Sequence, residues 1–232
     1  MNTVTETIVL TSIKEEYNSK QGLIQKHIRV CAGTGCIANG SRQVYDRFVE
    51  CVSEHNLELL TKIEFVHEEN SLVATTSGCQ GFCQMGPLVT IDEPEVMYIK
   101  VRVEDVDEIV SRTLLNNEIV NRLCYRDKEK KQYCPTTSEI SFYSKQHRLV
   151  LKGCGVIDPE DIKCYIASGG YDSAQKVLTS FTDVEICNLI EQSGLRGRGG
   201  GGFTTGKKWH FTRLVESEKK YLICNGDEGD PG

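Results

Sequence analysis

Two short cysteine motifs decide how the first part of this chain is interpreted: Cys31-Ala-Gly-Thr-Gly-Cys36 and Gly78-Cys-Gln-Gly-Phe-Cys-Gln-Met-Gly-Pro87. Each motif places two cysteines on a glycine-rich loop. Small residues there let the backbone curve closely around an inorganic core and direct amide N–H groups at its sulfurs. The four candidate ligands are Cys31, Cys36, Cys79 and Cys83. The motifs therefore indicate an iron–sulfur cluster of two irons.

A structural zinc site and plain buried thiols are the alternatives. Zinc knuckles favour a gap of two residues within each cysteine pair, whereas the gaps here are four and three residues. The chain has 11 cysteines, and its N-terminus carries Glu6 and no basic run, so a secretory signal is not expected. Without export, metal or redox chemistry is a better explanation for these thiols than disulfides. We expect the seven other cysteines to be buried, small apolar side chains. For one pair, Cys124 and Cys134, a different role stays open.

The predicted elements around the motifs follow the order strand, helix, strand, hairpin, helix, after a short amphipathic helix near the N-terminus. The hairpin surrounds Asp92-Glu-Pro-Glu95, and the last helix carries an apolar stripe from Val106 to Leu114. The expected strands are 27–32, 63–66, 88–91 and 96–101, and the expected helices are 1–20, 41–55 and 106–114.

This order and the cysteine spacing resemble the thioredoxin-like [2Fe–2S] ferredoxins, which include the small iron–sulfur subunit of respiratory complex I. Gly78, Gly81, Gly86 and Pro87 are in register with that pattern. The resemblance covers about residues 1–118. It implies an α/β thioredoxin-like domain that binds a [2Fe–2S] cluster through the four cysteines.

The rest of the chain is expected to contain a linker, 119–148, and the first part of an α/β domain, 149–232. A charged run, Arg126-Asp-Lys-Glu-Lys-Lys131, suggests the linker. Asp158-Pro159 is predicted to begin one helix, and Thr182-Asp-Val-Glu185 has the capping-box form that begins another. A helix through Phe211, Leu214 and Val215 and a strand at 221–224 are then expected.

A glycine-rich loop, Gly194-Leu-Arg-Gly-Arg-Gly-Gly-Gly-Gly-Phe-Thr-Thr-Gly-Lys-Lys-Trp209, lies between two predicted helices. The spacing of its glycines matches a dinucleotide-binding fingerprint. That fingerprint requires a strand before the loop, and no strand is predicted there. The loop also lacks the Ser or Thr that a P-loop places after its lysine. An RNA-binding segment and a flexible linker are further alternatives. Exposed backbone N–H groups at a helix N-terminus, with nearby lysines and arginines, favour an anionic, phosphorylated cofactor.

This loop and Tyr221-Leu-Ile-Cys-Asn-Gly-Asp-Glu-Gly-Asp-Pro-Gly232 are similar to the flavin-binding subunit of complex I and of NAD-linked iron hydrogenases. Residues 142–174 also resemble the start of that flavin domain. The resemblance implies that the loop binds FMN and that NADH is the substrate. The implied FMN contacts are Gly197, Arg198, Gly199, Gly200, Lys208, Asn225 and Asp227. The implied NADH contacts are Phe203, Phe211, Glu228 and Asp230.

The acidic stretch 225–230 has two other interpretations, a solvated turn and a calcium loop, of which the second needs a further glutamate downstream. Two positions depart from the family pattern. Thr204 replaces a common proline, and Asp230 is one methylene shorter than the glutamate common in complex I.

Composition narrows the functional class. The 232 residues carry a net charge of −6, so nucleic acid is not an expected partner. Charges interrupt every apolar run, so no membrane span is expected, and a cytoplasmic protein is predicted. Hydride transfer on the flavin needs no protein acid or base.

We expect an NADH dehydrogenase or diaphorase subunit that passes electrons between NADH, FMN and iron–sulfur clusters of a hydrogenase-like or complex I-like assembly. The fused ferredoxin domain resembles the diaphorase subunits of soluble hydrogenases. The chain is expected to be a fragment, with a [4Fe–4S] domain beyond its end. The alternative is a stand-alone [2Fe–2S] electron carrier with an inactive partial flavin domain.

Overall fold

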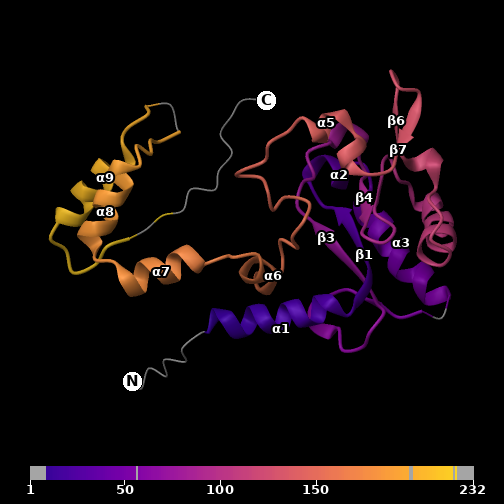
Figure 1. Cartoon of the computed structure of the whole chain (residues 1–232), viewed down its shortest axis with the longest axis horizontal. Helices are drawn as coiled ribbons and strands as arrows, with labels where there is room; N and C mark the ends of the chain where they lie inside the picture. Colours follow the sequence, from indigo (N-terminus) through magenta and orange to yellow (C-terminus); the bar gives the residue numbers. More distant parts are fainter. Residues whose placement is uncertain (1–8, 56, 199–200, 222, 224–232) are drawn as a thin grey trace. The chain divides into compact units, whose positions relative to one another are not determined.

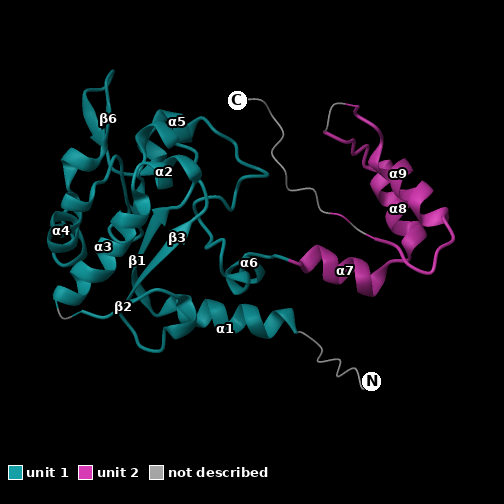
Figure 2. Cartoon of the chain, turned by 180° about the vertical axis from the view of Figure 1, so that it is seen from behind, with its two compact units in different colours: residues 1–170 teal, residues 171–232 magenta. Residues whose placement is uncertain are grey.

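The computed structural model describes residues 9–55, 57–198, 201–221 and 223. It divides into two compact units, Met1–Gly170 and Tyr171–Gly232, which are coloured separately in Figure 2. Each unit is described by itself. Within the described ranges, no helix is both long enough and apolar enough to cross a membrane.

The first unit is built on a five-stranded sheet whose strands lie in the order β2-β3-β1-β4-β5 (Figure 1). β1 pairs in parallel with β3, and β3 pairs in parallel with β2, whereas β1–β4 and β4–β5 are antiparallel. The strands are β1 (Ile24–Cys31), β2 (Leu59–Leu60), β3 (Ser71–Ser77), β4 (Val89–Ile91) and β5 (Val96–Tyr98). The predicted α/β thioredoxin-like arrangement is confirmed.

The helices of the first unit are mostly short. They are α1 (Leu10–Gly22), α2 (Thr34–Ala38), α3 (Ser41–Glu54), α4 (Val106–Glu108), α5 (Ser141–Ser144) and α6 (Ile162–Ala167). α4 continues as a π-helical turn through Ile109–Leu114, so the predicted closing helix is present. The predicted helix at 41–55 and the hairpin around Asp92 are also present.

The two faces of the sheet bury different side chains, because neighbouring residues of a strand point to opposite faces. Ile28 and Ala74 face a large apolar cluster that includes Phe48 of α3 and Ile109. Val73 belongs to a second cluster, which contains Tyr17 of α1 and Cys164 of α6. The central strands are therefore covered on both faces, as expected for parallel strands.

The second strand of the sheet was predicted in the wrong place. Residues 63–66 form a 3₁₀ turn, Ile63–Phe65, with Ile63 and Val66 buried in the cluster around Tyr17. Their separation of three residues suits a helical turn, in which both side chains lie on one side. The strands on either side of this turn are β2 (Leu59–Leu60) and β3, and in β3 four consecutive residues, 72–75, are buried and give no alternating pattern.

The segment predicted as a linker, 119–148, packs within the first unit. Strands β6 (Tyr125–Asp127) and β7 (Gln132–Cys134) form a hairpin, and Val120, Cys124 and Ile140 are buried in the core clusters. Apolar residues at both ends of the charged run thus attach it to the sheet. The functional boundaries at 118 and 149 stay a prediction.

The second unit contains α7 (Asp172–Ser180), α8 (Asp183–Gln192) and α9 (Thr205–Leu214). The predicted capping box at Thr182 is confirmed, since its hydroxyl accepts from Glu185 N and the Glu185 carboxylate accepts from Thr182 N. The predicted helix carrying Phe211 is also present as α9. α7 was not predicted.

Three further expectations need correction or lie outside the described residues. The helix predicted to begin at Asp158-Pro159 has Asp161 as its N-cap, because Asp161 accepts from Lys163 N while Asp158 accepts from Glu160 N in a preceding turn. The apolar residues that follow the capping box, Ile186, Leu189 and Ile190, predict a buried stripe on α8, but Leu189 is exposed. Residues 222 and 224 of the predicted strand 221–224 lie outside the described residues.

Candidate functional site

The four candidate ligands meet because two parallel strands end at the same edge of the sheet. β1 ends at Cys31, which is in register with Ser77, the last residue of β3. Cys79 follows two residues later. α2 then carries Cys36, and a 3₁₀ turn begins at Cys83. The sheet topology therefore brings the two cysteine loops together.

The loops approach each other so closely that two glycines leave no room for a side chain. A Cβ on Gly33 would lie 2.9 Å from Cys79 Cβ and 3.1 Å from Cys79 Sγ. A Cβ on Gly86 would lie 2.6 Å from Cys36 Sγ. These contacts join the first loop to Cys79 and the second loop to Cys36, so the glycines of the motifs are needed for the convergence of the four thiols.

The thiols divide into a buried pair and an exposed pair. Cys31 and Cys36 are each only 1% exposed, whereas Cys79 and Cys83 are exposed and their sulfurs lie 3.7 Å apart. A hydrogen bond with Cys36 lowers the pKa of the Cys31 thiol to about 6, and the same interaction together with burial raises the pKa of Cys36. Soft sulfur donors in this close arrangement fit an iron–sulfur cluster, which takes thiolate ligands.

An apolar cluster surrounds the buried pair. It contains Phe82, Leu88, Met97, Cys134 and Ile140. This shell keeps water from one side of the site and leaves the Cys79–Cys83 side accessible, which is a useful arrangement for a centre that exchanges electrons at a protein surface.

The remaining cysteines mostly behave as small apolar side chains. Cys51, Cys124, Cys134, Cys164 and Cys187 are buried, as predicted. Cys154 is half-buried, and Cys224 lies outside the described residues. All ten described cysteines are free, which includes the pair Cys124 and Cys134.

The glycine-rich loop closes on itself directly before α9. Gly197 N donates to Phe203 O at 2.8 Å, and Thr205 N donates to Leu195 O at 2.9 Å. The backbone therefore returns to its starting point and enters α9 at Thr205, with Lys208 exposed in the first turn of the helix. The positive end of the helix and this ammonium group make the loop favourable for an anion.

The structure describes only part of the predicted flavin and NADH site. Phe203 and Phe211 have ring centroids 6.5 Å apart and are both exposed. Gly197 and Arg198 are exposed at the start of the loop. Gly199, Gly200, Asn225, Asp227, Glu228 and Asp230 lie outside the described residues. The assignment of these residues to FMN and NADH stays a prediction.

Sequence analysis missed the side chains that contact the Cys79–Cys83 loop from outside the ferredoxin motif. Phe142, Tyr143 and Arg148 all touch residues 80–82. These residues begin the stretch 142–174 that resembles the start of the flavin domain, but nothing in Phe142-Tyr-Ser-Lys-Gln-His-Arg148 indicates a contact with the cysteine loop.

Comparison with known proteins assigns both parts of the chain. Residues 16–114 match the thioredoxin-like [2Fe-2S] ferredoxin family, and residues 190–232 match the Nuo51 FMN-binding domain. The site thus belongs to the class of thioredoxin-like iron–sulfur proteins. More particularly, this chain joins such a ferredoxin domain to sequence of the FMN-binding domain found in complex I-type dehydrogenases.

Curated relatives each match part of the chain. The chain is 50% identical over 96 residues to the HndC component of the NADP-reducing hydrogenase of Solidesulfovibrio fructosivorans, covering 41% of this chain and 19% of that protein. It is 45% identical over 84 residues to an NADH-quinone oxidoreductase subunit of Rhizobium meliloti, covering 36% of this chain and 20% of that protein. The chain therefore spans about a fifth of the length of these relatives.

A solved thioredoxin-like [2Fe-2S] ferredoxin of Aquifex aeolicus is 32% identical and is covered over 93% of its length by 42% of this chain, with a TM-score of 0.34.

Proposed function

We propose that this chain is the NAD(P)H-linked electron-transfer subunit, or diaphorase, of a multi-subunit oxidoreductase such as an iron hydrogenase or a complex I-like assembly. The observation that carries the proposal is one chain that holds both a converged four-cysteine site and a glycine-rich loop matching an FMN-binding domain. The names of the two curated relatives, a hydrogenase subunit and a quinone oxidoreductase subunit, support the same class of activity.

Two different cofactors are proposed to bind this chain, each to its own set of residues. When bound, FMN exchanges a hydride for single electrons and the [2Fe–2S] cluster carries single electrons. Cys31 and Cys36 hold the cluster from the buried side, while Cys79 and Cys83 hold it at the surface, where a redox partner can approach. The other subunits of the assembly are the proposed partners.

The proposed flavin and substrate residues act by binding and orientation. Lys208 and Arg198 supply positive charge for the FMN phosphate, and the loop N–H groups supply hydrogen bonds. Phe203 and Phe211 offer exposed aromatic faces for the rings of NADH. Asn225 and Asp227 are proposed as polar FMN contacts, and Glu228 and Asp230 as neighbours of the nicotinamide.

Anaerobic purification followed by NADH addition tests the proposal. We expect the purified protein to contain bound flavin and a cluster. The visible absorbance of both cofactors should decrease when NADH is added. Lys208→Ala should reduce flavin content, whereas Lys176→Ala on α7 serves as a control that removes a lysine away from the loop in sequence. Unchanged flavin content in Lys208→Ala contradicts the role given to Lys208.

A stand-alone electron carrier is the second candidate, and the contrast between the units favours it. The first unit buries two of its candidate ligands, Cys31 and Cys36, in an apolar cluster, whereas Phe211 and Leu214 of the second unit are exposed among the described residues. A purified protein with a reducible cluster, no flavin and no response to NADH supports the carrier and contradicts the expectation that this chain binds flavin.

A further inference from the structure

Three side chains from the segment after the ferredoxin core contact the loop between Cys79 and Cys83. The Phe142 ring stacks on Phe82 with centroids 4.7 Å apart and planes 10° apart. The Tyr143 ring meets the same Phe82 edge-on at 5.5 Å. Phe82 is buried, so these rings cover a side chain that lies next to a candidate ligand. We refer to Phe142, Tyr143 and Arg148 as the clamp.

The clamp also binds the backbone of this loop. The Tyr143 hydroxyl donates to the Gln80 carbonyl at 3.1 Å, and Arg148 Nη2 donates to the same oxygen at 2.9 Å. The Arg148 guanidinium lies over the Tyr143 ring, 5.7 Å from its centroid. A carbonyl oxygen accepts two hydrogen bonds, so both lone pairs of the Gln80 oxygen are used by clamp residues.

Arg148 lies directly against the main chain between the two exposed ligands. Gly81 has φ +86°, and a Cβ there would lie 2.5 Å from Arg148 Nη2. Gln80 is held from the other side, since its buried side chain donates to Ser77 Oγ at 3.2 Å. The loop that carries Cys79 and Cys83 is thus fixed between β3 and the clamp.

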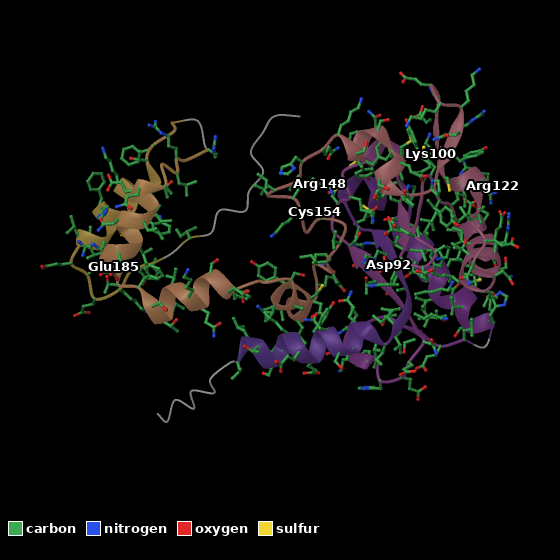
Figure 3. All side chains as sticks on the ribbon, viewed as in Figure 1. Asp92, Lys100, Arg122, Arg148, Cys154 and Glu185 are labelled. Carbon is green, nitrogen blue, oxygen red and sulfur yellow. The ribbon has the colours of Figure 1, made fainter. Side chains whose placement is uncertain are left out.

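The charge of Arg148 is not neutralised by the groups that it contacts. In the part of the chain that the structure describes, its guanidinium donates to the Gln80 carbonyl, the Cys154 carbonyl and the Gln146 amide oxygen. All three acceptors are uncharged. Figure 3 shows Arg148 and Cys154 near each other in the first unit. A positive charge therefore remains beside the cysteine loop, where one-electron reduction of a cluster adds negative charge.

We propose that the clamp positions the Cys79–Cys83 loop and that Arg148 raises the reduction potential of the cluster bound there. This inference rests on the proposed function, because it needs a cluster on the four cysteines. Arg148 is a positioning and tuning residue, since it acts through the Gln80–Gly81 backbone and through its charge. The clamp lies in the region that resembles the start of the flavin domain, so the potential of the cluster depends on sequence outside the ferredoxin motif.

A redox titration of the full chain tests the inference. The cluster is titrated anaerobically and followed by visible absorbance and by the paramagnetic signal of the reduced form. At a fixed solution potential near the wild-type midpoint, the ratio of reduced to oxidised cluster should fall by roughly three- to tenfold in Arg148→Ala and Arg148→Gln. Arg148→Lys keeps the positive charge. Its ratio of reduced to oxidised cluster should therefore fall less than that of either neutral variant.

Arg122→Ala is the matched control. Arg122 pairs with Asp105 and Glu108, and Figure 3 shows it on the far side of the first unit from Arg148. Its removal should leave the titration unchanged. A second readout is cluster loss in the presence of an iron chelator, which Tyr143→Phe should accelerate several-fold because one of the two donors to Gln80 is lost.

The outcomes separate the two claims. A wild-type chain without a cluster overturns the proposed function and the inference with it. A wild-type cluster whose potential is unchanged in Arg148→Ala and Arg148→Gln, or changed as much in Arg122→Ala, overturns only the role of Arg148. Should Arg148→Ala lose its cluster during purification, the titration of Arg148→Gln against Arg148→Lys decides the matter.

Discussion

The two units hold their candidate sites in different ways. In the first unit, both cysteine loops emerge from a sheet with apolar clusters on each face, and Phe48 and Ile28 are fully buried. In the second unit, the glycine-rich loop depends on α9 and on a few backbone hydrogen bonds, while Leu178 is 84% exposed and Leu214 is 66% exposed.

This difference separates a site that is fixed by its own domain from one that is only partly formed by the described residues. The four thiols are placed by strand register and by glycine contacts, which need nothing beyond the first unit. The aromatic faces of Phe203 and Phe211 are exposed and need a ligand or further protein to cover them. The predictions below test this contrast.

The largest effect is expected from Cys36→Ser. Cys36 is buried beside Cys31 with Gly86 close to its sulfur, and its replacement removes one of the four candidate ligands. The cluster should be lost or its paramagnetic signal in the reduced state strongly shifted. Cys154→Ser, which alters a half-buried thiol, is the control and should keep the wild-type spectrum. A spectrum of Cys36→Ser that is identical to that of the wild type excludes Cys36 as a ligand.

Core substitutions should distinguish the units directly. Phe48→Ala leaves a cavity in the first unit and should lower its free energy of unfolding by about 3–5 kcal/mol. Leu178→Ala, at an exposed position of the second unit, should change the free energy of unfolding by less than about 0.5 kcal/mol. Denaturant unfolding followed by circular dichroism measures both. Similar losses in the two variants would show that Leu178 is covered in solution.

His27 should make the first unit sensitive to acid. Its Nε2 lies 2.8 Å from Thr75 Oγ1, and burial, with a smaller contribution from Arg29, lowers the pKa of His27 to about 4. The unfolded chain binds the proton at a pKa near 6.5, so the folded state loses stability as the pH falls from about 6.5 towards 4.

Between pH 7.5 and pH 5, His27 should account for a loss of about 2 kcal/mol in the free energy of unfolding. The measurement is urea unfolding at several pH values for the wild type and His27→Gln. The difference between their free energies of unfolding should shrink as the pH falls. A difference that stays constant from pH 7.5 to pH 5 shows that His27 does not titrate in this way.

A smaller effect than that of His27 is expected at the capping box of α8. Thr182→Ala removes the hydroxyl that accepts from Glu185 N, which should cost about 1 kcal/mol of helix stability. Thr182→Ser keeps this acceptor and should cost much less. Because α8 packs against α9, proteolysis of the glycine-rich loop offers a sensitive readout, and equal cleavage rates in the two variants count against the cap.

Features encoded by short-range patterns could be predicted from the sequence. The helix expected at 41–55 is present as α3, where Val44, Phe48 and Val52 recur at helical spacing, and Thr182 with Glu185 predicted the start of α8. The cysteine motifs gave the candidate ligands, because their spacing and glycines are local properties. In each case the residues that form the pattern lie within a single helix or loop.

Features that depend on tertiary contacts could not be predicted. β3 is buried along four consecutive residues and shows no alternation of buried and exposed side chains. The sequence pattern therefore favours the nearby apolar segment 63–66 as the strand. α7 follows Tyr171, whose φ of +64° is a left-handed backbone conformation that nothing in the local sequence indicates. The contact of Arg148 with Gln80 joins residues that are distant in the sequence, and only the packing of the first unit brings them together.

Metal and sulfide analysis of the anaerobically purified chain tests the central claim most directly. Cys31, Cys36, Cys79 and Cys83 are held together by the fold, and a cluster on these four thiols contains two irons and two sulfides. The account predicts about two irons and about two acid-labile sulfides for each chain, in a coloured protein that dithionite bleaches. One zinc for each chain without sulfide, or a colourless protein without metal, contradicts it.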